Sequence, residues 1–349
     1  MTDAFSPNPF SLVEMVQAIN LIPSAYGRIN GLSIFRDQGV TTTTVGFEEL
    51  KGVLRLLRFQ ERGARGAEHQ YDKRKIRTFS IPHIPLPASL LAEKFQNVRG
   101  FGLDAGPDPF TKAVMDLLAL LRNNHAITLE WLRMGALKGV ILDADSSITH
   151  DLFDEFQIGD SDPTDFEESK VGKRLQLNFE LDSDATDVRA KCMMVKRHIE
   201  QNLQGDTMSD VRVLVSAAFY DALTAHAKVK EAFSGWQAAQ DRLAGDMRKG
   251  FTFGGITFEE YSAFATDPSG DIVPFIESGY GHAFPVGTSQ TFTTFYAPAD
   301  YKETVNTPGL PLYAKMEEMR FGKGWDIETQ SNPLPICSRP GVLVELIAE

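Results

Sequence analysis

The sequence predicts an α+β protein, and three patterns support that prediction. Apolar residues recur at helical spacing between residues 108 and 135, and the runs on either side of them alternate as in β-hairpins. A strand of the buried type, VRVLV at residues 211–215, leads directly into another helix. The chain has 349 residues, of which 42% are hydrophobic, so it can bury a large core in roughly two or three domains.

The first 84 residues predict an arm followed by a long hairpin. Residues 1–46 show little periodicity apart from a short helix expected at residues 11–20, and they lack the basic and apolar stretches of a secretory signal. Residues 47–84 alternate as a hairpin, with VLRLLRF ascending and IRTFSI descending. A hairpin of this length cannot bury both faces on its own domain, so it either stays in solvent or lies on a neighbouring molecule.

Asp108 and Pro109 predict the start of a long helix, because aspartate caps the free amides of the first turn and proline tolerates the first helical position. The apolar pattern continues to Gly135, which corresponds to a helix of roughly 27 residues and about 40 Å. Trp131 is expected on its buried face. A second hairpin should follow, with residues 137–142 and 148–156 as its two strands.

The second half of the chain predicts an α/β lobe that begins after a boundary at residues 159–185, which are acidic and rich in turn-forming residues. A helix is expected from Thr186 to Leu203, and another should be opened by Ser216 directly after the strand at residues 211–215. Further strands are predicted at residues 251–253, 256–261, 292–296 and 312–314 and close to the C-terminus.

Charge is gathered in two opposite blocks. Residues 51–77 hold nine basic and three acidic side chains, a net charge of +6, although the whole chain carries −12. Residues 143–168 hold ten acidic side chains and no Lys or Arg. Either block alone can be a solvated surface, but the two together indicate pairing within or between copies. The residues expected at such intersubunit contacts are Arg55, Arg58, Arg62, Arg65, Lys73, Arg74, Lys75, Asp151, Asp154 and Glu155.

Residues that would carry catalysis or bind a cofactor or metal do not form a recognisable constellation. Phosphate-loop, dinucleotide, HExxH and GxSxG motifs are absent, and the seven histidines are scattered singly. Cys192 and Cys337 are too few and too far apart for a disulfide scaffold or a zinc module. The acidic run from Asp143 to Asp154 has offsets of a calcium loop, but Ile148 occupies the position that requires glycine, so a polar turn is expected there.

The sequence gives little support for contacts with nucleic acid or a membrane. Aromatic residues among the basic side chains of residues 51–77 allow contact with nucleic acid, although such residues more often cover the hairpin's own apolar face. No stretch of the sequence reaches 18 apolar residues, so no membrane span is expected.

The last third of the chain resembles the major capsid proteins of tailed phages, of the lambda major head protein type (phage capsid E family). The resemblance lies in GHAFPVG (residues 281–287), in FTTFYAPADYKETVNTPGLPLYAK (292–315) and in QSNPLPICSRPGVLVELIAE (330–349). APAD together with QSNPL and a following RP is the most distinctive combination.

This resemblance implies the Hong Kong 97 phage capsid fold and a structural function without catalysis. It implies an N-terminal arm (1–46), an extended loop (47–84), a peripheral domain with a spine helix (85–185), an axial domain (186–310) and C-terminal strands that return to the peripheral domain (311–349). Copies would assemble as pentamers and hexamers into an icosahedral shell of the virion, formed in the host cytoplasm. The implied partners are scaffolding protein, portal protein, in some members a decoration protein, and packaged double-stranded DNA without sequence-specific contact.

The alternative from another class is a cytosolic α/β enzyme whose site is assembled from scattered residues. Its most enzyme-like feature is the capped turn from strand to helix at Ser216. An enzyme needs a pocket, whereas a capsid subunit needs the basic hairpin for its neighbours.

Overall fold

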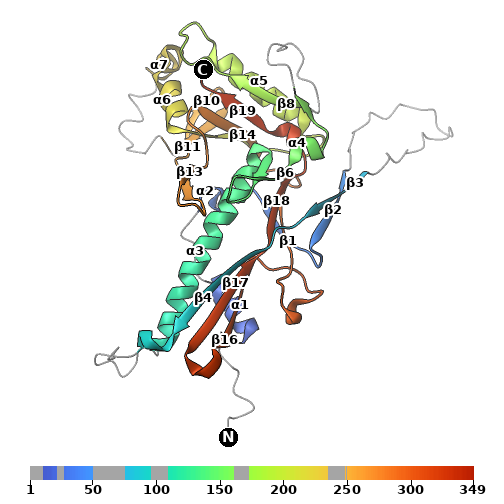
Figure 1. The fold of residues 1–349 in the computed structure, drawn as a ribbon. Coiled ribbons are helices and arrows are strands. Elements are labelled where there is room, and N and C mark those ends of the chain that lie inside the picture. The colour runs from blue at the N-terminus through green and yellow to red at the C-terminus, as the bar shows by residue number, and fades with distance from the viewer. Residues whose placement is uncertain are drawn as a thin grey trace, which may run out of the picture. The chain divides into compact units, whose positions relative to one another are not determined.

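The computed structural model describes residues 11–21, 27–49, 75–95, 109–160, 173–234, 248 and 250–349. The chain divides into two compact units, each built from segments that are distant in sequence. The first consists of Met1–Gly46, Thr78–Glu130 and Thr294–Pro335, and the second of Phe47–Arg77, Trp131–Thr293 and Ile336–Glu349. Helices and strands occur in both units, as expected for an α+β protein (Figure 1).

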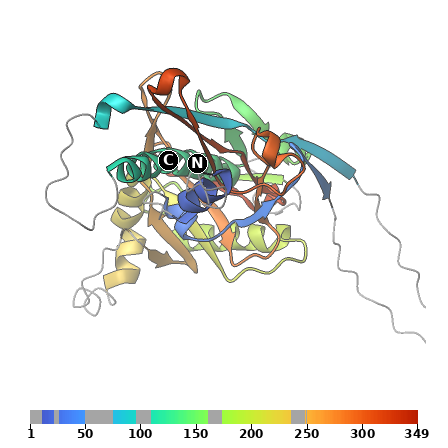
Figure 2. The same cartoon turned by 90° about the horizontal axis from the view of Figure 1, so that it is seen from below.

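The first unit contains a three-stranded antiparallel sheet. Its central strand, β17 (Gly324–Ser331), pairs with β16 (Tyr313–Glu318) on one side and with β4 (Ile84–Leu91) on the other. Figure 2 shows β4 in cyan running alongside the red strands. α1 (Leu12–Leu21) packs beside β16, which confirms the short helix expected at residues 11–20.

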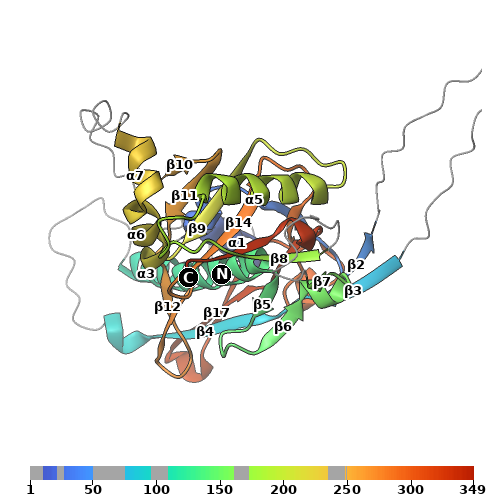
Figure 3. The ribbon, with the colours of Figure 1, turned by 90° about the horizontal axis from the view of Figure 1, so that it is seen from above.

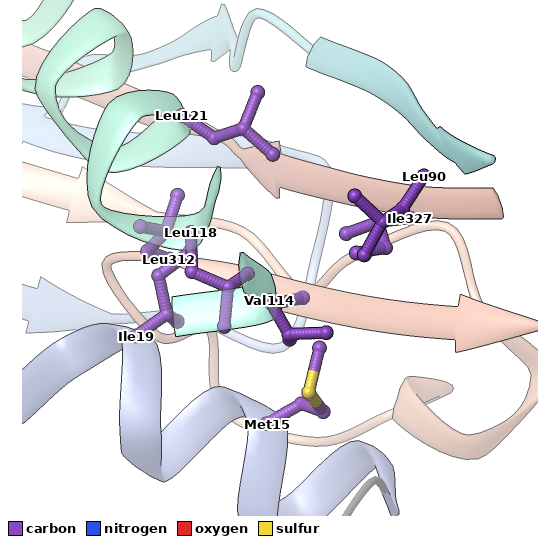
Figure 4. Close-up of a cluster of buried hydrophobic side chains, with 9 residues drawn as sticks. Met15, Ile19, Leu90, Val114, Leu118, Leu121, Leu312 and Ile327 are labelled. Atoms are coloured by element: carbon purple, nitrogen blue, oxygen red, sulfur yellow. The ribbon is translucent and has the colours of Figure 1, made fainter. Parts of the chain in front are cut away.

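The core of the first unit joins this sheet to α1 and to α3 (Pro109–Lys138). In Figure 4 the side chains from these elements point toward one another, and each is at most 4% exposed. Such burial is the main stabilising contribution to folding. The residues are Met15, Ile19, Leu90, Val114, Leu118, Leu121, Leu312 and Ile327.

The long helix α3 is confirmed, but it ends at Lys138 rather than at Gly135. Gly135 lies inside the helix. A glycine is needed there because a Cβ would stand only 2.9 Å from the carbonyl oxygen of Val140. This glycine therefore permits a close backbone approach instead of ending the helix. Gly139, with φ of 86°, adopts the left-handed conformation that follows a helix end. The predicted cap, Asp108, lies outside the described residues.

Smaller elements lie wholly or partly in the first unit. A second three-stranded sheet has the order β1-β15-β18. The helix α2 was not expected from the sequence, and β2 pairs with β3 as the described base of the predicted hairpin. The strand VLRLLRF lies outside the described residues. The bounds are α2 Arg28–Gly31, β1 Arg36–Gly39, β2 Thr44–Glu49, β3 Lys75–Ser80, β15 Phe292–Tyr296 and β18 Pro333–Cys337.

A seven-stranded mixed sheet with the order β10-β11-β9-β14-β19-β8-β7 organises the second unit. β9, the predicted strand VRVLV, lies between a parallel partner and an antiparallel one, and its side chains at Val211, Val213, Leu214 and Val215 are buried. The bounds are β7 Gly159–Asp160, β8 Lys173–Asn178, β9 Asp210–Val215, β10 Phe251–Phe253, β11 Ile256–Glu260, β14 Tyr280–Val286 and β19 Val344–Ile347.

Three helices accompany this sheet, and Figure 3 shows them from above. α5 (Val188–Asn202) packs against β14 and begins where Asp187 accepts a hydrogen bond from Ala190 N. α6 (Ala217–Ala225) packs against β11 and is capped by Ser216, as predicted. α7 (Ala227–Ser234) follows α6 directly.

The second predicted hairpin is confirmed only in part. β5 (Val140–Leu142) and β6 (Ile148–Asp151) pair around a turn, but residues 152–155 form a short helix, α4 (Leu152–Glu155), instead of continuing the strand. Asp151 causes the change, because its carboxylate accepts hydrogen bonds from Phe153 N and Asp154 N and so caps a helix. A further small hairpin, β12 (Phe264–Thr266) with β13 (Ile272–Pro274), was not predicted.

Candidate assembly surfaces and motif contacts

The basic half of the predicted contact set falls almost entirely outside the described residues. Arg55, Arg58, Arg62, Arg65, Lys73 and Arg74 all belong to that part of the chain, and Lys75 begins β3. One neighbouring cation is described: the Arg77 guanidinium lies 5.3 Å from the centre of the Phe156 ring. This cation–π contact links the end of the basic block to the acidic block within one subunit.

The acidic residues of the set divide into two kinds. Asp151 is bound to the amides at the start of α4, so its carboxylate has a local role. Asp154 and Glu155 are exposed on that helix and present their charge to solvent. The contacts between the basic and acidic blocks of different copies stay a prediction.

The offsets reminiscent of a calcium loop are accounted for by turn hydrogen bonds. Asp143 Oδ1 accepts from Ala144 N at 2.6 Å, and Asp145 Oδ1 accepts from Ser147 N at 2.9 Å. The hydrogen bonds from Ser147 lower the pKa of Asp145. Among the residues that the structure describes, no group of three or more His, Cys, Asp or Glu side chains is arranged to hold a metal ion.

The two motifs that carry the family resemblance are hydrogen-bonded to each other. Gln330 Oε1 accepts from the amide of Asp300, the last residue of APAD, at 2.8 Å. Asn332 binds the same segment twice: its Nδ2 donates to Pro298 O at 2.8 Å, and its carbonyl accepts from Ala297 N at 3.0 Å. Three hydrogen bonds therefore hold QSN and APAD together within the first unit.

Asn332 also holds a second segment. Its Oδ1 lies 2.9 Å from Nδ1 of His83, just before β4. Nearby, Ser331 Oγ donates to Pro311 O at 2.7 Å. Gly309, in the TPGLP part of the resemblance, approaches the carbonyl of Tyr296 so closely that any Cβ would overlap it. These motif residues therefore have structural roles in joining distant segments.

The RP that follows QSNPL is part of a second network, in the second unit. Asp206 is the centre of this network, and its side chain is 2% exposed. Its carboxylate accepts from Gln290 N at 3.0 Å, from the Thr291 and Ser289 hydroxyls at 2.8 Å, and from Arg339 Nη1 at 3.1 Å. Although burial alone would raise it, the hydrogen bonds from Gln290, Thr291 and Ser289 lower the pKa of Asp206 well below its usual range. Nothing in the sequence marked Asp206 except its place after a predicted helix.

Four candidate nucleophiles and bases within the described ranges are engaged or inert. Burial raises the pKa of both Cys192 and Cys337 to about 12, so the thiols stay protonated. Burial lowers the pKa of His125 to about 4, which keeps its imidazole neutral. Ser216 lies at the turn that most resembles an enzyme site. Its hydroxyl oxygen accepts hydrogen bonds from the amides of Phe219 and Gly279.

Comparison with known proteins identifies the family of this chain. The model of the family described as phage major capsid protein E matches residues 11–348. The chain belongs to this family. It is 28% identical to the major capsid protein of Salmonella phage Felix O1 over 372 residues, covering 97% of this chain and 96% of that protein. It is also 28% identical to the major capsid protein of Pseudomonas phage KPP10 over 355 residues, covering 97% of each.

The solved structures agree on the fold. The subunit in the mature capsid of bacteriophage PhiM1 is 11% identical, with a TM-score of 0.51 over 93% of this chain and 87% of that one. The chain thus has the Hong Kong 97 capsid fold that its sequence resemblance implied. The chain is a structural component of a phage capsid, and its copies self-associate into the shell. The enzyme alternative is not supported. None of the helices within the described ranges has the length and apolarity to cross a membrane.

Proposed function

We propose that this capsid subunit forms pentamers and hexamers that close into the icosahedral shell around the double-stranded DNA genome of a tailed phage. The family match along residues 11–348 is the observation that supports this proposal. Assembly would take place in the host cytoplasm with scaffolding and portal proteins, and in some shells with a decoration protein. The packaged DNA would be held without sequence-specific contact.

The proposed parts of the subunit follow the capsid fold. Residues 1–46 would be the arm, 47–84 the extended loop, 85–185 the peripheral domain with the spine helix α3, and 186–310 the axial domain. The C-terminal segment 311–349 contributes β16 and β17 to the sheet that contains β4, while its last strand, β19, pairs with β14 and β8.

Contacts between copies would use the two charge blocks. The basic hairpin of one subunit would lie on the acidic surface of the next, where Asp154 and Glu155 are exposed. Exposed ion pairs contribute about 0 to 1 kcal/mol each, so the contact would depend on many pairs repeated around the shell.

Electron microscopy and light scattering of the purified protein test the proposal. We expect shells, tubes or capsomer rings, with fivefold and sixfold rings among the particle images. A monodisperse small oligomer under all salt and scaffold conditions would contradict it.

A further inference from the structure

The turn between β16 and β17 presents an aromatic side chain to solvent. Residues 320–323, Arg-Phe-Gly-Lys, form this turn and are all exposed, and the Phe321 side chain is 91% exposed. The turn is closed at its base, because Met319 N donates to Gly324 O at 2.9 Å and Gly322 N donates to Met319 O at 3.1 Å. We call residues 320–323 the RFGK tip.

Phe321 is also an unfavourable residue for the backbone at this position. Its φ of 68° and ψ of 19° lie in the left-handed region, which glycine and asparagine adopt readily and an aromatic residue does not. Phe321 therefore weakens the turn and adds nothing to the core of its own subunit. A residue with both properties indicates a contact made outside the subunit.

A groove of about 940 Å³ lies on the outer face of the same three-stranded sheet. The groove forms because successive side chains of a strand point to opposite faces of the sheet. Ile327 and Leu90 point to the core. Their neighbours Asp326 and Ser89, which are cross-strand partners, line the groove. Asp300, the last residue of APAD, and Tyr301, which follows it, also line the groove. We call this surface the sheet groove.

The sheet groove is apolar in part and acidic at its rim. Pro85 and Pro87 of β4 offer an apolar surface without side-chain charge. Four carboxylates line the groove against one lysine, Lys315, whose Nζ lies 3.3 Å from Glu317 Oε1 and 3.5 Å from Glu303 Oε1. The groove therefore keeps an excess of negative charge. Its carboxylates are those of Asp300, Glu317, Asp326 and Glu328.

We propose that the RFGK tip of one subunit docks in the sheet groove of a second copy of this chain. Phe321 would pack on Pro85 and Pro87, and the charges of Arg320 and Lys323 would face the acidic rim. Tip and groove belong to the same unit, so every copy in a shell carries both halves of the contact. Such a head-to-tail contact generates a ring when its rotation closes. This inference rests on the proposed self-assembly.

Two other occupants fit less well. The tip cannot enter its own groove, because the short turn is held by its closing hydrogen bonds beyond the end of the sheet. Paired DNA offers no exposed base face on which Phe321 could stack, and two cations alone neutralise few phosphates.

A Phe321→Gly variant tests the tip with two opposite readouts. Glycine suits the backbone of this position, so the melting temperature of the unassembled subunit should stay equal or rise. Assembly of DNA-free particles, measured by light scattering and sedimentation, should require an about tenfold higher subunit concentration, because a central aromatic contact is lost. If the parent protein assembles and the variant assembles equally well, the proposal is wrong. Failure of the parent itself to assemble would instead count against the proposed function.

A charge exchange tests the groove as the receptor. Arg320→Glu with Lys323→Glu should abolish assembly, and adding Glu317→Lys with Asp326→Lys should restore it to within about threefold of the parent. If melting shows that the fourfold variant is misfolded, the smaller pair Lys323→Glu with Asp326→Lys gives the same comparison. A folded exchange variant that stays unassembled would rule out the groove. Normal DNA-free assembly of the tip variant with loss of DNA retention would overturn the proposal in favour of a DNA contact.

Discussion

At the scale of single residues, buried polar side chains hold together segments that are distant in the sequence. Asp206 binds the loop at residues 288–291 and the Arg339 of the C-terminal motif with one carboxylate. Gln330 and Asn332 do the same for the APAD segment. These residues are stabilising only while every partner is in place, because an unsatisfied buried group is costly.

Asp206→Asn should lower the free energy of unfolding by about 3 kcal/mol, because it removes the charge that Arg339 and five further donors require. Chemical denaturation of unassembled subunits measures this loss. Asp221→Asn, on the exposed surface of α6, is the matched control and should change stability by no more than about 0.5 kcal/mol. Equal effects of the two substitutions would show that the network does not stabilise the fold.

Buried histidines predict a loss of stability in acid. His125 Nε2 lies 2.9 Å from Thr329 Oγ1, whose hydroxyl donates to Leu86 O, so the imidazole donates to Thr329. Its pKa is lowered by burial from 6.5 to about 4, so below pH 6.5 the unfolded chain binds a proton that the folded subunit does not. The folded state should lose about 3 kcal/mol between pH 6.5 and pH 4, and none above pH 6.5.

A His125→Gln variant isolates this contribution. The variant should be less stable at pH 7.5 by about 1 kcal/mol, yet its stability should fall less steeply between pH 6.5 and pH 4. Urea unfolding at a series of pH values gives both slopes. An unchanged slope would assign the acid sensitivity to other groups, such as His282, whose pKa is lowered to about 3 by burial and by the charges of Lys138 and Arg174.

At the scale of elements, the C-terminal end of α3 is fastened to the β5–β6 hairpin. Trp131 donates from Nε1 to Leu142 O at 3.1 Å, and its ring meets Phe275 edge to face with 5.2 Å between ring centres. Gly135 brings the helix backbone next to β5. Trp131 is half-buried, so the expectation that it lies on the buried face of the helix is met only in part.

Trp131→Ala should cost about 2 to 3 kcal/mol, less than a fully buried tryptophan, and Trp131→Phe about 1 kcal/mol for the lost hydrogen bond. Leu120→Ala is the control on the same helix, because Leu120 is 58% exposed and its truncation should be nearly silent. Thermal melting of the three variants decides the order. A Trp131→Ala subunit as stable as the Leu120→Ala subunit would show that the Trp131 contacts do not stabilise the end of α3.

At the scale of the whole molecule, the separated charges predict how assembly depends on salt. Neutralising Arg55, Arg58, Arg62 and Arg65 together should weaken assembly without lowering the melting temperature, whereas one substitution should have little effect. The difference from the parent should shrink at high salt, because the screening length falls to about 3 Å at molar ionic strength.

Light scattering of the fourfold variant without DNA, at low and high salt, measures this effect. The nucleic-acid alternative predicts normal empty particles and a loss of DNA retention only. Normal DNA-free assembly at low salt would therefore refute the intersubunit role of the basic block.

Local patterns in the sequence determined those elements whose signals lie within a few turns of chain. The strand at residues 211–215, the cap at Ser216 and the apolar periodicity of α3 are of this kind, because burial alternation, helix period and capping act between near neighbours. The motif strings of the last third likewise indicate the family without any tertiary contact.

Only the tertiary structure decided what depends on distant segments. The sequence indicated Gly135 as the end of the helix, whereas the close approach of β5 accounts for a glycine inside it and Gly139 follows the actual end. The pairing of β17 with β4 joins residues more than 200 positions apart, and with it come the core below the sheet and the acidic groove above it. The Asp206 carboxylate owes its structural role to hydrogen-bond donors such as Ser289 and Arg339, which lie 83 or more positions away along the chain. Such contacts form because the folded chain must bury apolar surface and satisfy its buried polar groups at once, a condition that no local pattern expresses.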